Sequence, residues 1–454
     1  MESSDSSLKG PAGAIRSAAI PALDCYTEPS EERFTNRFMT KPHIVVHYHE
    51  LWLKGGNRRF FLGKLITAIK RALEGVGVER LHCPGDRVVV ELREGAAAEP
   101  AVERLSRVFG IAYFAVAHVI PREQADADAS SICRIAWDEL APLTFSSFAV
   151  RAKRSDKTFA RTSGEIESLV GRYLLDRLRE AGREVRVNLN QPEVTCRIEI
   201  TRDSALLYAH KIPGAGGLPP NTAGRMTCLL SGGFDSAVAA YKMMRRGAHV
   251  SFVHFWGGGA QAGDSSVHVA RDLVRRLVPW QFTAKLYLVP FEPLQREIVA
   301  HAPETFRVLL YRRLMLRIAE HFARQNHSLG IITGDSLGQV ASQTLHNMAA
   351  VGSVAQMPLY RPLAGDDKME ILVLARKIGT HDISAEPFHD CCPIFMPRTP
   401  ALHATIAELD QAEAKLDVPA LVARGVETTA HERYKCVAGS VERVESLRST
   451  TAKV

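Results

Sequence analysis

No apolar run in this 454-residue chain approaches the roughly 20 residues that a membrane-spanning helix needs, because charged residues interrupt the apolar segments. The eight cysteines are scattered and lack the dense framework that staples small secreted domains. The N-terminus starts with Glu2 and Asp5, and Arg16 and Pro21 break its short apolar stretch, so no signal peptide is expected. These absences exclude a membrane protein and a disulfide-rich secreted domain, and we expect a soluble, cytoplasmic protein.

The chain also lacks any Cys-x-x-Cys spacing, which is typical of structural zinc sites and many iron–sulfur clusters. Cys391 and Cys392 are vicinal, an awkward arrangement for holding one metal ion, and only Cys436 follows them. We therefore expect no metal site built from protein side chains alone.

Apolar residues make up 46% of the chain and charged residues 24%, a balance typical of globular proteins with real cores. At roughly 150 residues per domain, the length predicts about three domains. The net charge is +7, and residues 150–186 alone hold ten basic and six acidic side chains. This local excess favours contact with a polyanion.

Composition and periodicity divide the chain into five regions. Residues 1–40 predict a flexible extension. Residues 41–120 predict an α+β domain of ferredoxin-like type, and residues 121–212 predict a second α+β unit that carries the basic segment. Residues 213–225 are a Gly- and Pro-rich linker. Residues 226–454 alternate strand and helix patterns, which predicts a parallel sheet covered on both faces.

The hydrophobic pattern also places individual elements. Expected strands cover residues 44–48, 87–92, 111–120, 147–152, 185–189, 194–200, 205–209, 226–230, 249–255, 285–290 and 329–333. Expected helices cover residues 62–73, 102–108, 163–179, 237–246, 267–277 and 306–325. The charged tail, residues 405–454, predicts mostly helix. Ligands of parallel sheets bind beyond the carboxyl ends of the strands.

The strongest local motif is Ser-Gly-Gly-Phe-Asp-Ser at residues 231–236, which follows an apolar strand pattern and opens a helix. Free N–H groups of a Gly-rich turn and the positive helix end favour a phosphate. Asp235 would repel phosphates unless a divalent cation lay between them, so Mg²⁺ is expected. The alternative is a simple capped turn. No Lys follows the glycines, which excludes a Walker A loop.

This motif resembles that of the PP-loop ATP pyrophosphatases, which cleave ATP to AMP and pyrophosphate while adenylating a substrate. Further stretches in the same order resemble the tRNA 4-thiouridine synthase family, also called tRNA sulfurtransferase or ThiI. These stretches are residues 47–61, 150–163, 211–218, 229–236, 333–344, 361–380 and the segment around Cys391 and Cys392. The resemblance covers residues 43–417. It implies a ferredoxin-like domain, a THUMP RNA-binding domain over 121–212 and a PP-loop domain over 226–454, in the form without a rhodanese domain.

The resemblance implies an ATP site, with Asp235 serving Mg²⁺ and pyrophosphate and Lys368 stabilising the charge of the transferred phosphate. An isolated Arg or Lys is otherwise usually a solvated surface charge. Asp335 stands where the family usually has Glu. The implied nucleotide-binding residues are Leu229, Leu230, Ser231, Gly232, Gly233, Asp235, Ser236, His254, Phe255, Arg313, Gly334 and Gln343.

Cys391 and Cys392 are candidates to carry a persulfide, because a thiolate can hold sulfur and attack an activated carbon. The family resemblance implies Cys392 as the carrier, with Cys391 as the runner-up. A pair of buried structural cysteines is the alternative. The resemblance implies a cysteine desulfurase as sulfur donor, acting directly or through a separate rhodanese. Cys391, Cys436 or a thiol of a partner would then resolve the sulfur adduct by forming a disulfide.

The basic segment predicts an RNA-binding surface, because several cations near the end of one strand suit phosphate contacts on folded RNA. A solvated charged face is the alternative. The family resemblance implies tRNA as the partner and leaves a homodimer open. The expected RNA-binding residues are Arg151, Lys153, Arg154, Lys157 and Arg161.

The implied function is an ATP-dependent tRNA sulfurtransferase that makes 4-thiouridine at position 8 of tRNA through an adenylated uridine. A second family role is sulfur supply for the thiazole of thiamine. The alternative is a tRNA-modifying PP-loop ligase with a nitrogen nucleophile, which would not need Cys391 or Cys392. A protein that only binds RNA is hard to reconcile with an intact phosphate-binding motif.

Overall fold

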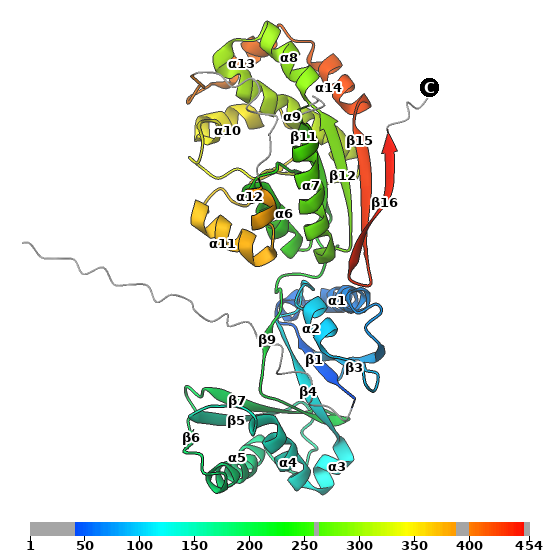
Figure 1. Ribbon diagram of the computed structural model, residues 1–454, viewed down its shortest axis with the longest axis vertical. Coiled ribbons are helices and arrows are strands. Elements are labelled where there is room, and N and C mark those ends of the chain that lie inside the picture. The colour runs from blue at the N-terminus through cyan, green and yellow to red at the C-terminus, as the bar shows by residue number, and fades with distance from the viewer. Residues whose placement is uncertain (1–40, 258–262, 387–398, 449–454) are drawn as a thin grey trace, which may run out of the picture. The chain divides into compact units, whose positions relative to one another are not determined.

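The computed structural model describes residues 41–257, 263–386 and 399–448. The strands of the described residues form two sheets, one over residues 43–213 and the other over residues 225–448 (Figure 1). No helix in these ranges is both long and apolar enough to cross a membrane.

The first sheet has the strand order β2-β3-β1-β4-β8-β7-β5-β6, with β9 also paired to β4. The first part of β4 pairs antiparallel with β1 and its last four residues pair antiparallel with β8, so one strand belongs to both α+β units. The strands are β1 His43–His47, β2 Val78–His82, β3 Arg87–Leu92, β4 Tyr113–Pro121, β5 Ser147–Arg154, β6 Arg186–Val187, β7 Val194–Ile200, β8 Ser204–Tyr208 and β9 Ile212–Pro213.

Helices cover the two halves of this sheet with separate cores. Helix α5 illustrates why these residues form helices with one buried face. Thr162 and Glu165 form a capping box at its start, and its buried positions recur at helical spacing through Ile166, Val170 and Leu174. The helices are α1 Arg58–Ala72, α2 Glu99–Leu105, α3 Arg122–Ala127, α4 Ala129–Leu140 and α5, Ser163–Glu180.

The second sheet has the order β14-β13-β10-β11-β12-β15-β16. Strands β14 to β12 of this order are parallel, and β15 and β16 are antiparallel additions at one edge. The strands are β10 Arg225–Leu229, β11 His249–Trp256, β12 Thr283–Pro290, β13 Ile331–Ile332, β14 Leu359–Tyr360, β15 Ala430–Val437 and β16 Ser440–Arg448.

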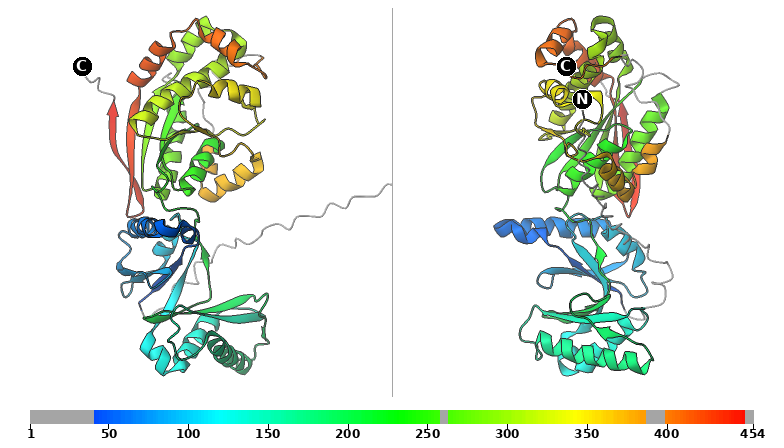
Figure 2. Two further views of the ribbon diagram at one scale, coloured as in Figure 1. Left: turned by 180° about the vertical axis from the view of Figure 1, so that it is seen from behind. Right: turned by 90° about the vertical axis from the view of Figure 1, so that its left-hand side faces the viewer.

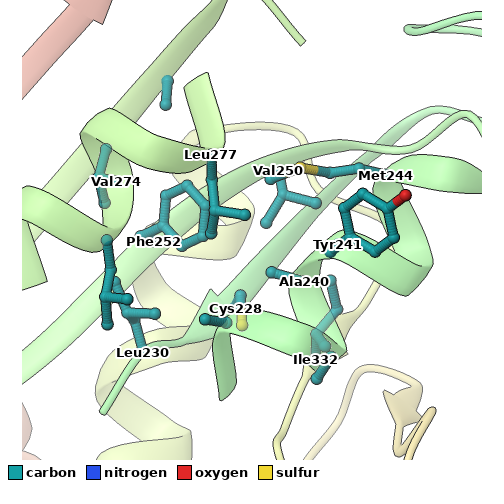
Figure 3. Packing of buried hydrophobic residues seen from close by; sticks show 14 of the residues in the cluster. Cys228, Leu230, Ala240, Tyr241, Met244, Val250, Phe252, Val274, Leu277 and Ile332 are labelled. Carbon is teal, nitrogen blue, oxygen red and sulfur yellow. The ribbon is translucent and has the colours of Figure 1, made fainter. Parts of the chain in front are cut away.

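Helices cover both faces of the second sheet (Figure 2). On one face, α6, α7 and α11 bury a core in which Cys228 and Phe252 of the strands meet Tyr241 and Leu277 of the helices (Figure 3). Helices α8, α9, α10, α13 and α14 bury the other face. The helices are α6 Phe234–Arg245, α7 Gly263–Leu277, α8 Glu292–His301, α9 Arg307–Gln325, α10 Leu345–Gly352, α11 Lys368–Ile378, α12 His381–Ala385, α13 Ile406–Glu413 and α14 Val418–Glu427.

The prediction of a mostly helical tail is wrong for residues 430–448, which form strands β15 and β16. The alternation that marks β15 is hidden because one of its inward residues is Glu432, which is 2% exposed. Its carboxylate is neutralised by Arg271 Nη2 at 2.8 Å. The sequence interpretation also missed strand β2 and helix α4.

Candidate active site

A cavity of about 490 Å³ opens where β10, β11 and β13 end. This is the carboxyl edge of the parallel strands, where ligands of such sheets bind, and the volume lies in the range of small-molecule sites. The walls come from several separate parts of the chain. The lining includes Leu229, Leu230, Ser231, Asp235, Ser236, Phe255, Arg312, Gly334, Asp335, Ser342, Gln343, Arg361, Pro400 and Ala401.

Two serines close the Gly-rich turn between β10 and α6. Ser236 Oγ accepts a hydrogen bond from the Ser231 backbone N–H at 3.0 Å and lies 3.1 Å from Ser231 Oγ. The Gly233 N–H donates to Ser231 Oγ at 3.3 Å. Because α6 starts directly after Gly233, its positive end faces this turn. The motif predicts that this turn, residues 231–236, is a phosphate cradle.

Gly334 brings the loop after β13 against this turn. A Cβ at residue 334 would lie 2.7 Å from the Ser236 backbone N and 2.9 Å from its Cα. Both neighbours are backbone atoms that no side-chain rotation can move away. The close approach therefore requires glycine at this position.

Asp235 and Lys368 meet at the cavity, although 133 residues separate them. Lys368 Nζ lies 2.7 Å from Asp235 Oδ1, and Gln339 Nε2 donates to the other carboxylate oxygen at 3.0 Å. The ammonium also lies 5.4 Å from the centre of the Phe234 ring. Both expected catalytic groups thus stand beside the phosphate cradle, with the Lys368 side chain still 43% exposed.

Arg312, not Arg313, lines the cavity. The prediction for Arg313 is wrong by one residue, since Arg313 points toward α13 instead and is 0% exposed. Its guanidinium pairs there with Asp410 at 2.8 Å and Glu413 at 3.0 Å. A run of two arginines on one helix gives no sequence signal for which of them faces inward.

Asp335 holds two arginines at the cavity wall. Arg312 Nη2 pairs with its carboxylate, and Arg361 Nε lies 3.3 Å away from it. Burial raises the pKa of Asp335, but Arg312, Thr333 and Arg361 outweigh that effect, so its pKa lies below the ordinary value. Arg361 is a cavity-lining cation for which the sequence analysis proposed no role.

The expected adenine-side residues differ in their placement. Leu229, Leu230 and Phe255 line the cavity. His254 is fully buried, and its ring nitrogens contact Leu230 O at 2.8 Å and Ser266 Oγ at 2.6 Å, so its side chain supports the wall from behind. The Gln343 side-chain oxygen is buried in the wall and has no hydrogen-bond partner among the described residues. It is an acceptor to which a ligand N–H group can donate.

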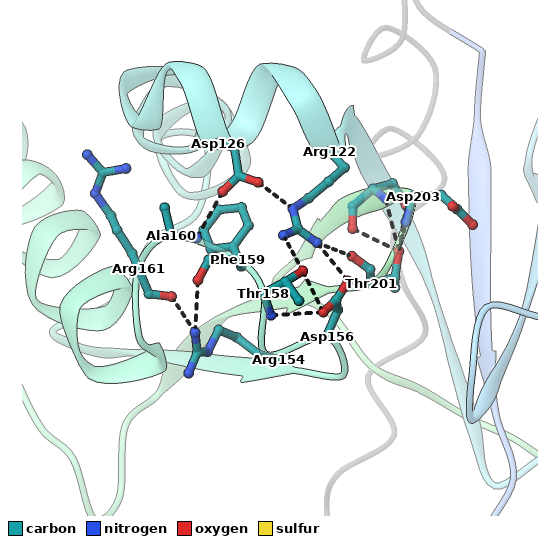
Figure 4. Close-up of polar contacts among 11 residues, drawn as sticks. Arg122, Asp126, Arg154, Asp156, Thr158, Phe159, Ala160, Arg161, Thr201 and Asp203 are labelled. Atoms are coloured by element: carbon teal, nitrogen blue, oxygen red, sulfur yellow. Dashed lines mark hydrogen bonds and ion pairs between the residues drawn. The ribbon is translucent and has the colours of Figure 1, made fainter.

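The predicted RNA-binding cations cluster at the end of β5, where Arg154 has a structural role (Figure 4). Arg154 Nη1 donates to the carbonyls of Phe159 and Arg161, at 3.1 and 2.9 Å, and so ties down the loop that follows β5. Lys157 is exposed within this loop. Figure 4 shows the Arg161 guanidinium directed away from these contacts.

Arg151 and Lys153 have partners of their own. Arg151 is exposed, and its guanidinium donates to the Leu189 carbonyl. Lys153 Nζ lies 2.9 Å from Asp86 and remains 65% exposed. The exposed cations can reach phosphates, whereas Arg154 shapes the surface that carries them.

Comparison with known proteins agrees with this geometry. Family models match residues 43–115 (ThiI ferredoxin-like domain), 129–210 (THUMP domain) and 221–418 (thiamine biosynthesis protein ThiI). A probable tRNA sulfurtransferase of Thermus thermophilus is 42% identical over 380 residues, covering 84% of this chain and 91% of that protein. The chain belongs to the tRNA sulfurtransferase (ThiI) family. The expected combination of ferredoxin-like, THUMP and PP-loop units is thereby confirmed.

Other tRNA sulfurtransferase relatives are similar over most of their length. A probable tRNA sulfurtransferase of Caldanaerobacter subterraneus is 40% identical, covering 83% of this chain and 96% of that protein. The crystal structure of a 4-thiouridine synthetase–RNA complex with bound ATP is 30% identical and has a TM-score of 0.77, covering 87% of this chain and 100% of the other.

The cysteines on which a sulfurtransferase would depend, Cys391 and Cys392, lie outside the described residues. Cys436 lies in β15, next to the start of β12. It is therefore near the amino ends of the parallel strands, whereas the cavity is at their carboxyl ends. Burial raises the pKa of the Cys436 thiol. A structural role for Cys436 fits this position, although in a strand rather than the expected helix. Among the described residues, no group of three or more His, Cys, Asp or Glu side chains is arranged to hold a metal ion.

Proposed function

We propose that this ThiI family member is an ATP-dependent tRNA sulfurtransferase that makes 4-thiouridine at position 8 of tRNA. The observation that carries the proposal is the meeting of Asp235 and Lys368 beside the phosphate cradle of residues 231–236. An acid and a cation at that place suit phosphoryl chemistry, in which positioning and charge stabilisation dominate. The family's 4-thiouridine synthetase–RNA structure with bound ATP supports the same assignment.

ATP fits the walls of the cavity. The α6 N-terminus with Ser231 and Ser236 would hold phosphate, and Arg312 would approach a phosphate or ribose from the opposite side. The unpartnered oxygen of Gln343 suits the exocyclic amino group of adenine, which donates hydrogen bonds. The apolar remainder of the lining, with Phe255 and Leu229, suits the base itself.

Asp235 is also the residue that would hold Mg²⁺ between itself and the nucleotide phosphates. Mg²⁺ in nucleotide sites commonly takes one or two carboxylate oxygens and fills its other positions with water and phosphate. When bound, the ion would neutralise the charge of the leaving pyrophosphate. The single carboxylate of Asp235 fits that requirement without further protein ligands.

The reaction would proceed in three displacements. The uridine O4 attacks the α-phosphorus, pyrophosphate leaves, and Lys368 stabilises the negative charge on the transferred phosphate. The terminal persulfide sulfur of Cys392 then attacks C4, and AMP leaves with the oxygen. A second thiol, from Cys391 or a partner, attacks the Cys392 sulfur, which leaves 4-thiouridine and a disulfide for an external thiol to reduce.

The remaining participants follow from the same proposal. The exposed cations after β5 would contact tRNA phosphates, and a cysteine desulfurase would load the persulfide, directly or through a rhodanese. The persulfide on Cys392 would also be the sulfur source for synthesis of the thiazole of thiamine. Position 8 of tRNA is thus the primary substrate, and thiamine sulfur supply a second outlet.

Replacing the cysteines tests this assignment. Cys392→Ala should abolish ATP-dependent 4-thiouridine formation, measured by nucleoside mass spectrometry, while ATP affinity stays at the wild-type value. Cys391→Ser is the matched variant, and its activity shows whether Cys391 resolves the disulfide. If the wild-type protein formed no 4-thiouridine, and the double variant Cys391→Ser/Cys392→Ala released pyrophosphate on tRNA at the wild-type rate, ligation of a nitrogen nucleophile would be favoured instead.

A further inference from the structure

Asn347, in the first turn of α10, is fully buried behind the cavity wall. Its Nδ2 donates to Ala341 O at 2.7 Å and to Ala401 O at 2.8 Å. Its Oδ1 accepts from the Ala404 N–H at 2.9 Å. One amide thus uses both of its N–H groups and its oxygen to join two stretches of backbone that lie 60 residues apart.

Both stretches belong to the wall of the nucleotide cavity. Residues 341–343 include Gln343, whose buried side-chain oxygen has no hydrogen-bond partner among the described residues, and residues 400 and 401 line the cavity beside them. Thr344 reinforces the joint, because its Oγ1 donates to Leu402 O at 2.7 Å. Asn347 itself does not line the cavity.

A second anchor holds the same segment from the short 3₁₀ helix Glu304–Phe306, which precedes α9. Thr305 Oγ1 donates to Thr399 O at 3.1 Å, and the Ala401 N–H donates to Thr305 O at 3.1 Å. Residues 399–404 are therefore fixed at both ends, by Thr305 and by Asn347. Asn is a weak helix former, so α10 gains little from it apart from these bonds.

We propose that Asn347 is a positioning residue that couples the nucleotide-facing turn 341–343 to the segment which leads away from the reactive cysteine. Cys392 lies seven residues before Thr399 in the sequence. The inference rests on the proposed function. The role of Asn347 is to keep sulfur transfer fast enough to use the adenylate before it hydrolyses. Asn347 does not itself bind ATP.

The readout is the amount of 4-thiouridine formed per pyrophosphate released. In Asn347→Asp, the carbonyls of Ala341 and Ala401 lose their donor and face a carboxylate. Adenylation continues, but sulfur transfer slows, and the waiting adenylate hydrolyses to uridine and AMP. We expect the ratio to fall by about tenfold, the scale of a small misplacement of reacting groups. A purely structural role would lower both products in parallel and leave the ratio unchanged.

Asn326→Asp is the matched control. Asn326 is also buried, and its Oδ1 accepts from Lys285 at 2.8 Å and Tyr287 at 3.0 Å, near the start of β10 and away from the cavity. The same chemical change there should leave the ratio at the wild-type value, whatever it does to melting temperature.

Thr305→Val keeps the inference testable if Asn347→Asp fails to fold. It removes only the hydroxyl that holds Thr399 O, and it should lower the ratio in the same direction. A wild-type ratio in a folded Asn347→Asp protein, or in Thr305→Val when the first variant does not fold, would overturn the inference. Absence of 4-thiouridine from the wild-type protein would instead overturn the proposed function.

Discussion

Lys368 Nζ and Asp235 Oδ1 lie 2.7 Å apart although the two residues start different helices, α11 and α6. The pair joins the predicted phosphate-binding turn to the start of a second helix. Lys368→Ala should therefore reduce the rate of pyrophosphate release about 10²- to 10³-fold, as loss of a charge-stabilising group does. ATP affinity should change far less, because the cradle itself remains.

Lys377→Ala is the control for that change, since Lys377 is an exposed cation on the same helix. Its kinetics should match the wild-type protein. If Lys368→Ala released pyrophosphate at the normal rate, the stabilising role of Lys368 would be wrong.

Gly334→Ala should weaken ATP binding by at least about tenfold, or about 1.4 kcal/mol. The added methyl group would meet the Ser236 backbone at 2.7 Å, so the loop after β13 must move away from the phosphate cradle. Titration calorimetry measures the effect. Gly365→Ala is the matched control, because a Cβ at Gly365 meets nothing within 4 Å.

Replacing the two adjacent arginines of α9 should affect different properties of the protein. Arg312→Ala should lose ATP affinity with the fold intact, because Arg312 lines the cavity. Arg313→Ala should cost about 3 kcal/mol of unfolding free energy, since it leaves the buried carboxylate of Glu413 with less compensation. Urea unfolding and ATP titration of both variants separate the two roles, and equal stability losses would contradict the assignment.

Asp335 should make the protein sensitive to acid. Its pKa is depressed in the folded state, so its contribution to stability is present above the unfolded pKa of about 3.9 and is lost as pH falls toward the folded value. Asp335→Asn should thus be less stable than the wild-type protein near neutral pH. The difference in unfolding free energy should shrink below about pH 4, and a constant difference would contradict the depressed pKa.

The cations after β5 should separate into binding and structural groups. Lys157→Ala should reduce the steepness of the plot of log affinity for tRNA against log salt concentration by about 1, which corresponds to one phosphate contact fewer. Arg154→Ala should instead increase amide hydrogen exchange over residues 155–161, because it loses the bonds to Phe159 and Arg161. Unchanged exchange in Arg154→Ala would show that the loop does not depend on this guanidinium.

The sequence predicted the elements whose apolar pattern is long and regular, such as β11 and α9. It also predicted that residues 231–236 form the turn after β10 and the start of α6, and several of these residues line the cavity. The sequence-based prediction failed where a buried position holds a charged residue, as at Glu432 in β15. The sequence cannot distinguish a buried carboxylate that an ion pair neutralises from one exposed to solvent. The prediction assigned the nucleotide contact to Arg313, whereas Arg312 lines the cavity, because helical phase within a pair of arginines depends on packing. The partners of Asn347 are backbone groups, and sequence carries no signal for such contacts.

Nucleoside mass spectrometry tests the central claim most directly. Unmodified tRNA is incubated with the protein, ATP, Mg²⁺, cysteine and a cysteine desulfurase, with and without an added rhodanese, and a reaction without ATP is the control. The account predicts 4-thiouridine at position 8 only where ATP is present. No 4-thiouridine in any of these reactions, with the protein folded and ATP bound, would contradict it.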